Sequence, residues 1–588
     1  MPARTLEFTP MRLILYVFLL APMPVFAAVV DWVAIEASVA KQSEDMVAGR
    51  KSGAIGLAIV ENGEVRFMHT AGFASRDAKR AFDIDTPVQV GELSRLATAG
   101  MAMRLVAKGK LDLDARVVSI LPELRWRGAT AKVRQMRVRH LLTHHSGLVP
   151  NRLHGMFRKP GDPIPSDPLA APLQLYADPG SMMSTSNLGF EVLGRVLERV
   201  SGRDLESLLQ TELVAPLGLT RTQFGIQPTS AAAHRKGKTE SALIARDRAA
   251  VGLSMSLHDL SRLLGALTPG TKSQWLSDSS RREMLRVQNA AVVLDVGNKV
   301  GFGWKLSSSV RDQVGTVATL SSTFPNFNAE ARLLPKHGIA LIAVSNWRES
   351  DEEIADLLAS ATDSVLTAKA GIAPRDLKRL MPDEIGLPAG ATADTFGARY
   401  ATPIGLMEFA QKKSNYDLRF LGFDFRVDRR ADGWFGLRFR LLGMIPLKFD
   451  AISRVLIRPA KLAGHHVILG FSDGNYFLFG STFAELGTSP RVEALLGEYR
   501  AVNPDALARQ LEIETAVLSF DGNMLTLDYV LPFVLSVRPR IALLPRDESH
   551  LVMAGFGPSL GEEIDVEHKD GKIRLTVSGY VLEKINKP

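Results

Sequence analysis

The most informative stretch of this sequence reads GELSRLATA and spans residues 91–99. Most of its residues favour helices, and apolar side chains recur at helical spacing as far as residue 105. It is followed by LVAKGKLDLD at residues 105–114 and by LLTHHSGL at residues 141–148. We therefore predict a helix that begins near Gly91, a turn after it, and a loop that carries two adjacent histidines.

Together these stretches resemble the class C beta-lactamases and the penicillin-binding-protein-like serine hydrolases. The resemblance implies an α+β domain over residues 28–372, with an antiparallel sheet flanked by helices. It also implies that the predicted helix opens with Ser-x-x-Lys, in which the serine is the nucleophile and the lysine is its base. Glu92 stands in the place of this serine, and Arg95 stands in the place of the lysine.

Glutamate and arginine cannot perform the chemistry of that pair. Glu92 has no hydroxyl, and the pKa of arginine stays above about 12, so Arg95 cannot act as a base near neutral pH. A lysine can, because burial and neighbouring cations lower its pKa. Ser94 is the nearest alternative, but its lysine would fall at Ala97, and Ser94 lies about 200 degrees around the helix from Glu92.

A second family motif also lacks its reactive residue. Residues 178–194 resemble the loop that carries the family's tyrosine, and Thr185 occupies the tyrosine's place, whereas Ser186 and Asn187 match. Threonine reaches less far than tyrosine and has no phenol to serve as an acid or base. Asn187 is interpreted as a brace for the loop, with ligand binding as the alternative.

The third motif places a lysine or histidine on an edge strand, as the resemblance implies. Aligning Pro325-Asn326-Phe327 with the family's turn puts Leu320 in the cation's place, followed by Ser321. Neither lysine nor histidine occurs between Asp312 and Glu330, so the conclusion does not depend on the exact alignment. All four reactive positions are therefore substituted.

These substitutions predict a pseudoenzyme that binds a ligand or a partner. The candidate ligands are a cell-wall peptide and a small amide or ester, and the candidate partner is a protein of the cell envelope. A second hypothesis is a serine hydrolase with an atypical site that uses Ser94, Ser184 or Ser186. A third is a platform on which the C-terminal region carries the interaction.

Glu92 and Arg95 are three residues apart, a helical spacing that permits an ion pair. The pair either fills the former catalytic pocket or forms a carboxylate–guanidinium site, with Asn187 and Ser321 as further hydrogen-bond partners of a polar ligand. If both charges are desolvated, removing one partner costs about 3–5 kcal/mol. No cofactor is expected.

Two other groups of residues bear on binding. His144 and His145 are adjacent and have no obvious further ligands, so we expect no metal site there. Residues 132–139 read KVRQMRVR, which we interpret as a half-exposed strand or a surface that contacts anions, and we favour a solvated face.

The composition is that of an ordinary globular protein, with 46% hydrophobic and 23% charged residues. The net charge of +8 favours contact with anionic surfaces such as phospholipid or wall polymers. No nucleic-acid-binding motif is present, and nucleic acid is not expected as a partner. The absence of cysteine excludes disulfides and thiol chemistry.

The first 27 residues predict a secretory signal. Arg4 and Arg12 precede an apolar run, and Val25-Phe26-Ala27 provides a cleavage site. A membrane anchor is the alternative, but Pro22 and Pro24 interrupt the run, which is shorter than the roughly 20 residues that a span needs. We therefore expect a periplasmic or secreted protein without a stable membrane span.

The C-terminal part is predicted to be rich in strands. Proline and glycine residues at 373–391 predict a linker. Beyond it, four Asp-Gly turns favour antiparallel, lipocalin-like barrels, one over residues 392–490 and one over residues 491–588. The similar sequences that end at Tyr400 and Tyr499 suggest a duplication.

Overall fold

The structure is a computed structural model of the chain. It describes residues 30–50, 53–128, 130–308, 313–375, 381–412, 415–441, 445–447, 454–484, 489–511, 514–529 and 539–585. The predicted signal segment, residues 1–27, lies outside the described residues. Within the part of the chain that the structure describes, no helix is both long enough and apolar enough to cross a bilayer.

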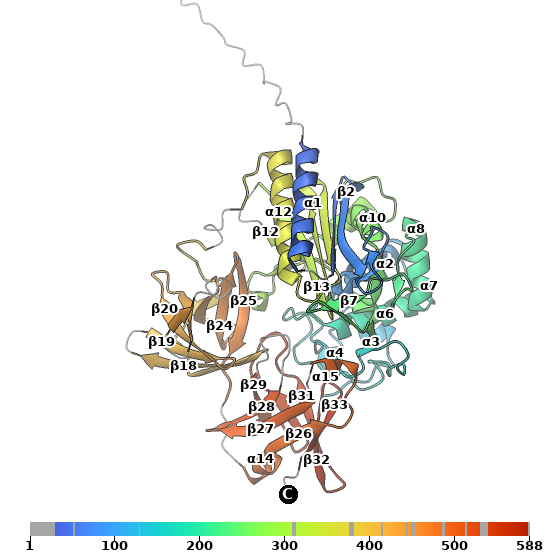
Figure 1. Ribbon diagram of the computed structural model, residues 1–588. Coiled ribbons are helices and arrows are strands. Elements are labelled where there is room, and N and C mark those ends of the chain that lie inside the picture. Colours follow the sequence, from blue (N-terminus) through green and yellow to red (C-terminus); the bar gives the residue numbers. More distant parts are fainter. Residues whose placement is uncertain are drawn as a thin grey trace, which may run out of the picture.

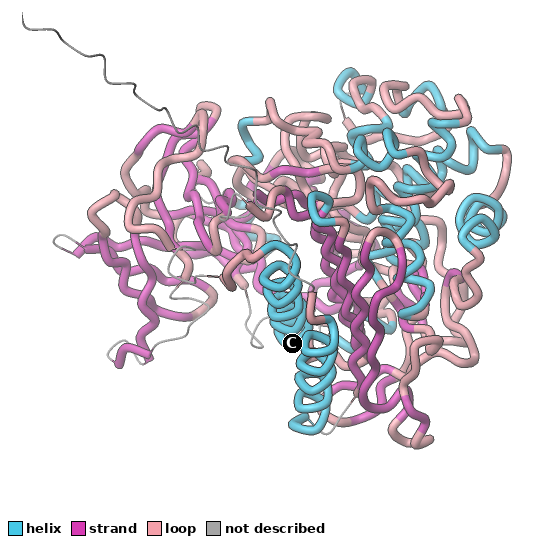
Figure 2. Tube along the Cα trace, turned by 90° about the horizontal axis from the view of Figure 1, so that it is seen from above, coloured by secondary structure: helices cyan, strands magenta, loops and turns pink. Residues whose placement is uncertain are grey.

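The N-terminal domain is built on one antiparallel sheet, which has eight strands in the described residues. Its strands, in spatial order, are β11 (Lys299–Val300), β12 (Lys305–Ser308), β13 (Thr316–Phe324), β14 (Phe327–Leu334), β15 (Ile339–Ser345), β1 (Ala54–Glu61), β2 (Glu64–Ser75) and β3 (Arg80–Ala81). Helices α1 (Trp32–Arg50) and α12 (Asp351–Ala370) lie side by side on one face, as Figures 1 and 2 show. This arrangement confirms the predicted α+β fold.

Side-chain size alternates along β1 and decides what each face of the sheet can pack against. Ile55, Leu57 and Ile59 pack towards α1 and α12, whereas Ala54 and Ala58 face the larger helical region on the other side. Successive side chains of a strand point to opposite faces, so both faces of this strand are buried. A hairpin turn at Asn62 and Gly63 joins β1 to β2.

The other face carries helices that include α2 (Ser94–Ala107), preceded by a single 3-10 turn at Gly91–Leu93. Against α2 lie α6 (Asn187–Ser201) and α9 (Arg248–Val251), whereas α10 (Leu257–Leu267) packs on β1, β2 and β15 of the sheet. Further helices here are α3 (Val117–Ile120), α4 (Thr130–Val133), α5 (Val138–Leu142), α7 (Leu205–Leu209), α8 (Ala215–Leu217) and α11 (Asp278–Met284).

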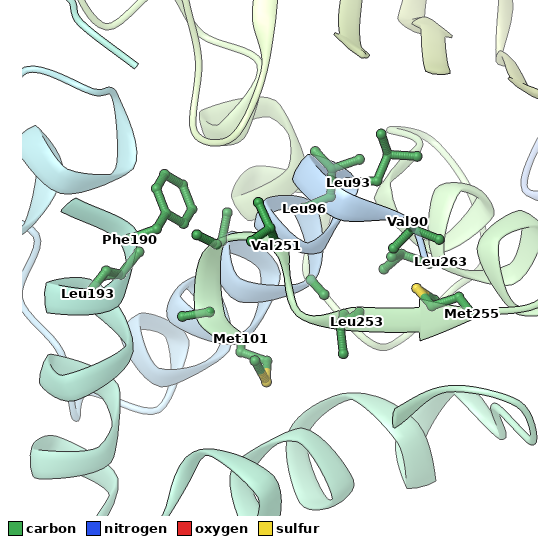
Figure 3. Packing of buried hydrophobic residues seen from close by; sticks show 14 of the residues in the cluster. Val90, Leu93, Leu96, Met101, Phe190, Leu193, Val251, Leu253, Met255 and Leu263 are labelled. Atoms are coloured by element: carbon green, nitrogen blue, oxygen red, sulfur yellow. The ribbon is translucent and has the colours of Figure 1, made fainter. Parts of the chain in front are cut away.

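Helix α2 is buried on almost every side, as a helix in the middle of a domain is expected to be. Figure 3 shows Leu96 and Met101 in the buried cluster that also contains Phe190 of α6 and Val251 of α9. Gly100 is required at its position because a Cβ there would lie 2.3 Å from the ring of Trp275.

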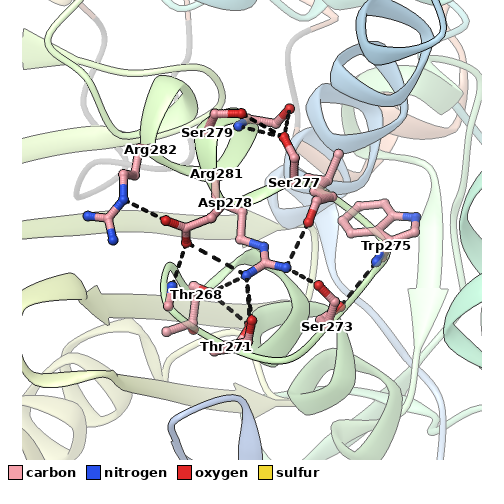
Figure 4. Close-up of polar contacts among 12 residues, drawn as sticks. Thr268, Thr271, Ser273, Trp275, Ser277, Asp278, Ser279, Arg281 and Arg282 are labelled. Atoms are coloured by element: carbon pink, nitrogen blue, oxygen red, sulfur yellow. Dashed lines mark hydrogen bonds and ion pairs between the residues drawn. The ribbon is translucent and has the colours of Figure 1, made fainter.

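The segment after α10 is held by a buried arginine. Arg281 is 2% exposed and donates to the carbonyl oxygens of Thr268, Thr271 and Leu276, and also to that of Ser273 (Figure 4). These hydrogen bonds from its two terminal nitrogens offset much of the cost of burying the guanidinium, although its Nε has no hydrogen-bond partner among the described residues. The contact fixes the segment that presses Trp275 against α2.

Two barrels follow, drawn in orange and red in Figure 1. The pairings of the first barrel close a ring through β17 (Arg399–Thr402), β18 (Gly405–Lys412), β19 (Asn415–Phe420), β20 (Phe423–Arg429), β21 (Phe435–Leu441), β23 (Leu456–Leu462), β24 (His465–Ser472) and β25 (Asn475–Ser481). The second is a closed barrel of β26 (Gly497–Ala501), β27 (Thr515–Asp521), β28 (Met524–Tyr529), β29 (Arg540–Pro545), β30 (His550–Met553), β31 (Glu563–Lys569), β32 (Lys572–Val577) and β33 (Tyr580–Lys584).

The two tyrosines that suggested a duplication have matching places. Tyr400 lies on β17 and Tyr499 on β26, the first strand of each ring, and both are fully buried. Their hydroxyls differ, however, because Tyr400 accepts from the backbone of Gly397 whereas Tyr499 donates to the carbonyl of Leu495.

The second barrel docks on a loop of the N-terminal domain. Asp505 accepts hydrogen bonds from the backbone N–H of Gly155 at 2.6 Å and from the hydroxyl of Tyr580 at 3.0 Å. Ser578 accepts from the backbone of His154 at 3.0 Å. Polar contacts of this kind fix the orientation of the barrel relative to the domain.

Glu562 lies in a cavity of this interface with Arg152 nearby. Burial raises the pKa of Glu562 to about 7, although the backbone of Ser578 and the charge of Arg152 oppose the shift. The folded chain therefore binds a proton on Glu562 more tightly than the unfolded chain, in which the carboxyl titrates near 4.5.

We expect Glu562 to make the chain less stable as the pH rises. Its effect is absent below the unfolded pKa of 4.5, develops as the pH rises to about 7, and is complete above that. The thermal midpoints of the wild type and Glu562→Gln should agree near pH 4.5 and diverge in favour of the variant at higher pH. A difference that does not change with pH would contradict this expectation.

Of the two alternatives for residues 132–139, the half-exposed strand is wrong, whereas the surface that contacts anions stays a prediction. Residues 132–139 do not form a strand, because α4 ends at Val133, a turn follows, and α5 begins at Val138. Val133, Met136 and Val138 are all buried against the domain, so the apolar residues of this run point inwards from helical turns.

Candidate functional site

A cavity of about 330 Å³ lies at the N-terminal end of α2. It collects residues from the three family motifs, namely Glu92, Arg95, Thr185, Leu320 and Ser321. The remaining lining residues include Thr143, His144, Met183, Gly303, Trp304 and Lys305. Positions that are far apart in the sequence are therefore brought together around Glu92.

Glu92 is held by a serine that the sequence did not single out. The hydroxyl of Ser322 donates to the carboxylate Oε2 of Glu92 at 2.6 Å. The backbone N–H of Glu92 donates to Ser322 Oγ at 3.0 Å. The predicted partner Ser321 lines the cavity but makes neither bond, because neighbouring residues of β13 point to opposite faces. Ser322 thus takes up the backbone N–H of Glu92 as well as its carboxylate.

Arg95 is the buried cation of the site. Its side chain is 4% exposed, and its Nη2 lies 4.0 Å from Glu92 Oε1, while the Glu92 side chain is 26% exposed. The ion pair is therefore long and only partly desolvated. Removing one partner should lower the free energy of unfolding by less than it would in a fully buried pair. Burial lowers the pKa of Arg95 and Glu92 raises it in part, but a guanidinium stays protonated.

Asn187 binds Arg95 instead of lining the cavity. Its side-chain oxygen accepts from Arg95 Nη2 at 2.5 Å, and its amide donates to Asn151 at 2.8 Å. The ring of Phe190 packs under the guanidinium, 5.7 Å from Arg95 Cζ. Asn187 therefore acts as a brace, and the brace is directed at the arginine that replaces the lysine.

The loop that carries Thr185 is held by a buried carboxylate. Asp295 accepts from the backbone of Met183 at 2.7 Å, from the amide of Asn289, and contacts His145 Nε2 at 2.8 Å. No motif indicates this contact, because Asp295 is more than 100 residues away from both the loop and His145. Thr185 itself is exposed in the cavity.

His144 lies at the wall of the cavity in a left-handed conformation, with φ of 61°. Its Nδ1 accepts from the backbone N–H of Ser186 at 3.1 Å, which requires an unprotonated nitrogen. Burial, with the charge of Arg95, holds the pKa of His144 well below its ordinary value. His144 is neutral at physiological pH and supports the loop.

The three alternative serines are buried and committed elsewhere or lack a base. Ser94 Oγ accepts from the backbone of Leu253 at 3.0 Å. Ser186 caps α6 by accepting from Gly189 and donates to the carbonyl of Val149. Ser184 is 4% exposed. None of the three lines the cavity that the structure describes.

Two further residues, Trp304 and Lys305, add an aromatic ring and a cation to the lining of the cavity. Lys305 is exposed and lies on β12, paired with Thr319 of β13, and Trp304 precedes it. Leu320 is not on a sheet edge, because β12 and β11 continue the sheet beyond β13. Lys305 precedes the segment between Asp312 and Glu330 that matches the third motif, and it lines the cavity from the neighbouring strand. The described residues contain no group of three or more histidine, aspartate or glutamate side chains that could hold a metal ion.

Known proteins share this domain. A beta-lactamase family model matches residues 39–363. Esterase EstB of Burkholderia gladioli is 33% identical over 188 residues, which are 30% of this chain and 47% of the esterase. Penicillin-binding protein 4* of Bacillus subtilis (strain 168) is 24% identical over 341 residues, 52% of this chain and 70% of that protein.

Among solved structures, the crystal structure of SurE has a TM-score of 0.55 at 19% identity and covers 76% of this chain and 99% of that chain, which shows a shared fold. The chain spans about half the length of relatives such as the esterase. Because the family model covers more than half of its residues, this chain belongs to the beta-lactamase family.

Proposed function

We propose that this chain is a pseudoenzyme that binds a small polar ligand, or a partner's polar group, in the Glu92 cavity without forming an acyl-enzyme. The contact between Glu92 and Ser322 carries the proposal, because it takes up both the side chain and the backbone N–H at the nucleophile's position. An oxyanion needs free donors at such a place. Arg95 supports it, since it cannot accept a proton.

The cavity offers groups suited to binding. Arg95 and Lys305 supply cations, Thr185 and Ser321 supply hydroxyls, and Trp304 supplies a ring. A cell-wall peptide or a small amide or ester carries the matching carbonyls and carboxylates. With the predicted signal segment, this favours a role in the cell envelope. Detection of a mature chain that begins at Ala28 in the periplasmic or secreted fraction tests the location.

The activity is tested with a fluorescent penicillin and a fluorophosphonate probe, with an active member of the family as a positive control. We expect the wild type to carry no label on any serine. A labelled Ser94, Ser184 or Ser186, identified by mass spectrometry, would support the alternative of a serine hydrolase with an atypical site and overturn the proposal.

Restoring the two motif residues alone should not restore labelling. In Glu92→Ser with Arg95→Lys, Ser322 still accepts the backbone N–H of residue 92, and Thr185 and Leu320 still lack reactive groups. We expect this double variant to label no faster than the wild type with either probe. Labelling of the double variant would show that the contact with Ser322 does not block the site.

A further inference from the structure

Another open cavity, of about 490 Å³, lies beside α5 and shares no lining residue with the Glu92 cavity; we call it the arginine cavity. Arg116, Arg134 and Arg137 line it, together with Gln135, His140 and Pro179. No carboxylate belongs to its lining within the described chain. It is therefore a concave surface of one charge.

The arginines are held together by the backbone. Arg116 and Arg137 face each other in an antiparallel bridge, which is closed by hydrogen bonds between Val117 and Met136 and between Val138 and Ala115. Like charges placed opposite each other in this way repel. The fold keeps them adjacent, so a bound anion would relieve a repulsion that is already present.

Nearby carboxylates neutralise this cluster only in part. Asp114 accepts two hydrogen bonds from Arg139, at 2.7 and 2.8 Å, and forms a longer ion pair of 3.8 Å with Arg137, which also donates to the Asp114 carbonyl at 2.8 Å. Asp178 pairs with Lys132 at 2.6 Å. In the part of the chain that the structure describes, Arg116 and Arg134 have neither a side-chain hydrogen bond nor an ion pair, and both are exposed.

His140 lines one side of the cavity, and its imidazole is neutral. Its Nδ1 accepts from the backbone N–H of Arg137 at 3.2 Å, as a neutral imidazole does. Burial, with His145 and Arg137 next in effect, lowers its pKa to about 4. An anion beside it would favour its protonated form and raise that pKa.

From these contacts we propose that Arg116, Arg134 and Arg137 form a binding site for a phosphate group. A planar guanidinium donates two parallel hydrogen bonds to phosphate oxygens, and three of them can surround one group from several directions. The group comes from an anionic lipid headgroup or from free phosphate. The site does not depend on what occupies the Glu92 cavity.

The test compares the wild type with Arg116→Gln/Arg134→Gln. Arg282→Gln/Arg286→Gln is the matched control, because it removes the same charge from exposed residues of another surface. Binding is measured to inorganic phosphate by NMR, following the His140 ring, and to vesicles of phosphatidylglycerol or of phosphatidylcholine by sedimentation. Circular dichroism confirms that all variants are folded.

We expect at least about a tenfold loss of affinity in the arginine-cavity variant and less than about twofold in the control. Binding to inorganic phosphate identifies free phosphate as sufficient, whereas binding only to phosphatidylglycerol identifies the headgroup. Equal losses in the two variants would overturn the proposal, since net charge alone would explain them. Absence of wild-type binding to both phosphate and phosphatidylglycerol would overturn it as well.

Discussion

Asp295→Ala is expected to lower the free energy of unfolding of the N-terminal domain by about 3–5 kcal/mol. The carboxylate is 4% exposed and is the partner of the Met183 backbone, the Asn289 amide and His145. Alanine leaves these buried groups without an acceptor, and each unpaired donor costs about 1–3 kcal/mol. The loop that carries Thr185 should also lose its anchor.

Hydrogen exchange of peptides from α6 in increasing denaturant measures this effect, because it reports the N-terminal domain separately from the barrels. Asp114→Ala is the matched control. Asp114 also accepts from an arginine, but its side chain is 53% exposed, so its loss should cost less than about 1 kcal/mol. Equal effects of the two substitutions would show that Asp295 is not the anchor of the loop.

Trp434→Ala is expected to destabilise the first barrel by about 3–5 kcal/mol. Trp434 is fully buried, packs near Phe471 and Tyr476, and donates from its ring nitrogen to the carbonyl of Ile385 at 2.8 Å. Ile385 belongs to the segment predicted as a linker. The tryptophan therefore joins that segment to the barrel, and alanine removes both the packing and the hydrogen bond.

Trp434→Phe separates these two contributions. Phenylalanine keeps much of the packing but leaves the carbonyl of Ile385 unpaired, so we expect a loss of about 1–3 kcal/mol. Exchange of peptides from β23 and β24 measures both variants. A loss below about 1 kcal/mol in the alanine variant would contradict the burial on which this prediction depends.

The fold could be predicted where local patterns have one structural outcome. Asn62-Gly63 between two apolar runs is a hairpin because both residues adopt positive φ, 51° and 88°. The Asp-Gly pairs at 473 and 570 form turns between strands for a similar reason. The strand alternative for residues 132–139 was wrong because mixed basic and apolar residues suit a half-buried strand and short helical turns alike.

The candidate site could be predicted only as far as the motifs extend. The positions of Glu92, Arg95, Thr185 and Leu320 around one cavity follow the family's alignment. Ser322 could not be identified as the partner of Glu92, because 230 residues separate them and the adjacent Ser321 fits the pattern equally well. Asn151, Asp295 and Lys305 belong to no motif, and only their contacts reveal them.

The sequence by itself determined that Glu92 and Arg95 cannot act as a Ser-x-x-Lys pair in any conformation, because glutamate has no hydroxyl and arginine stays protonated. The tertiary structure alone decided what the replacements do. Hydrogen bonds between side chains depend on distances of about 3 Å that arise only when strands and helices from distant parts of the chain pack together. That packing directs Ser322 to Glu92, Asn187 to Arg95, and three arginines to one cavity.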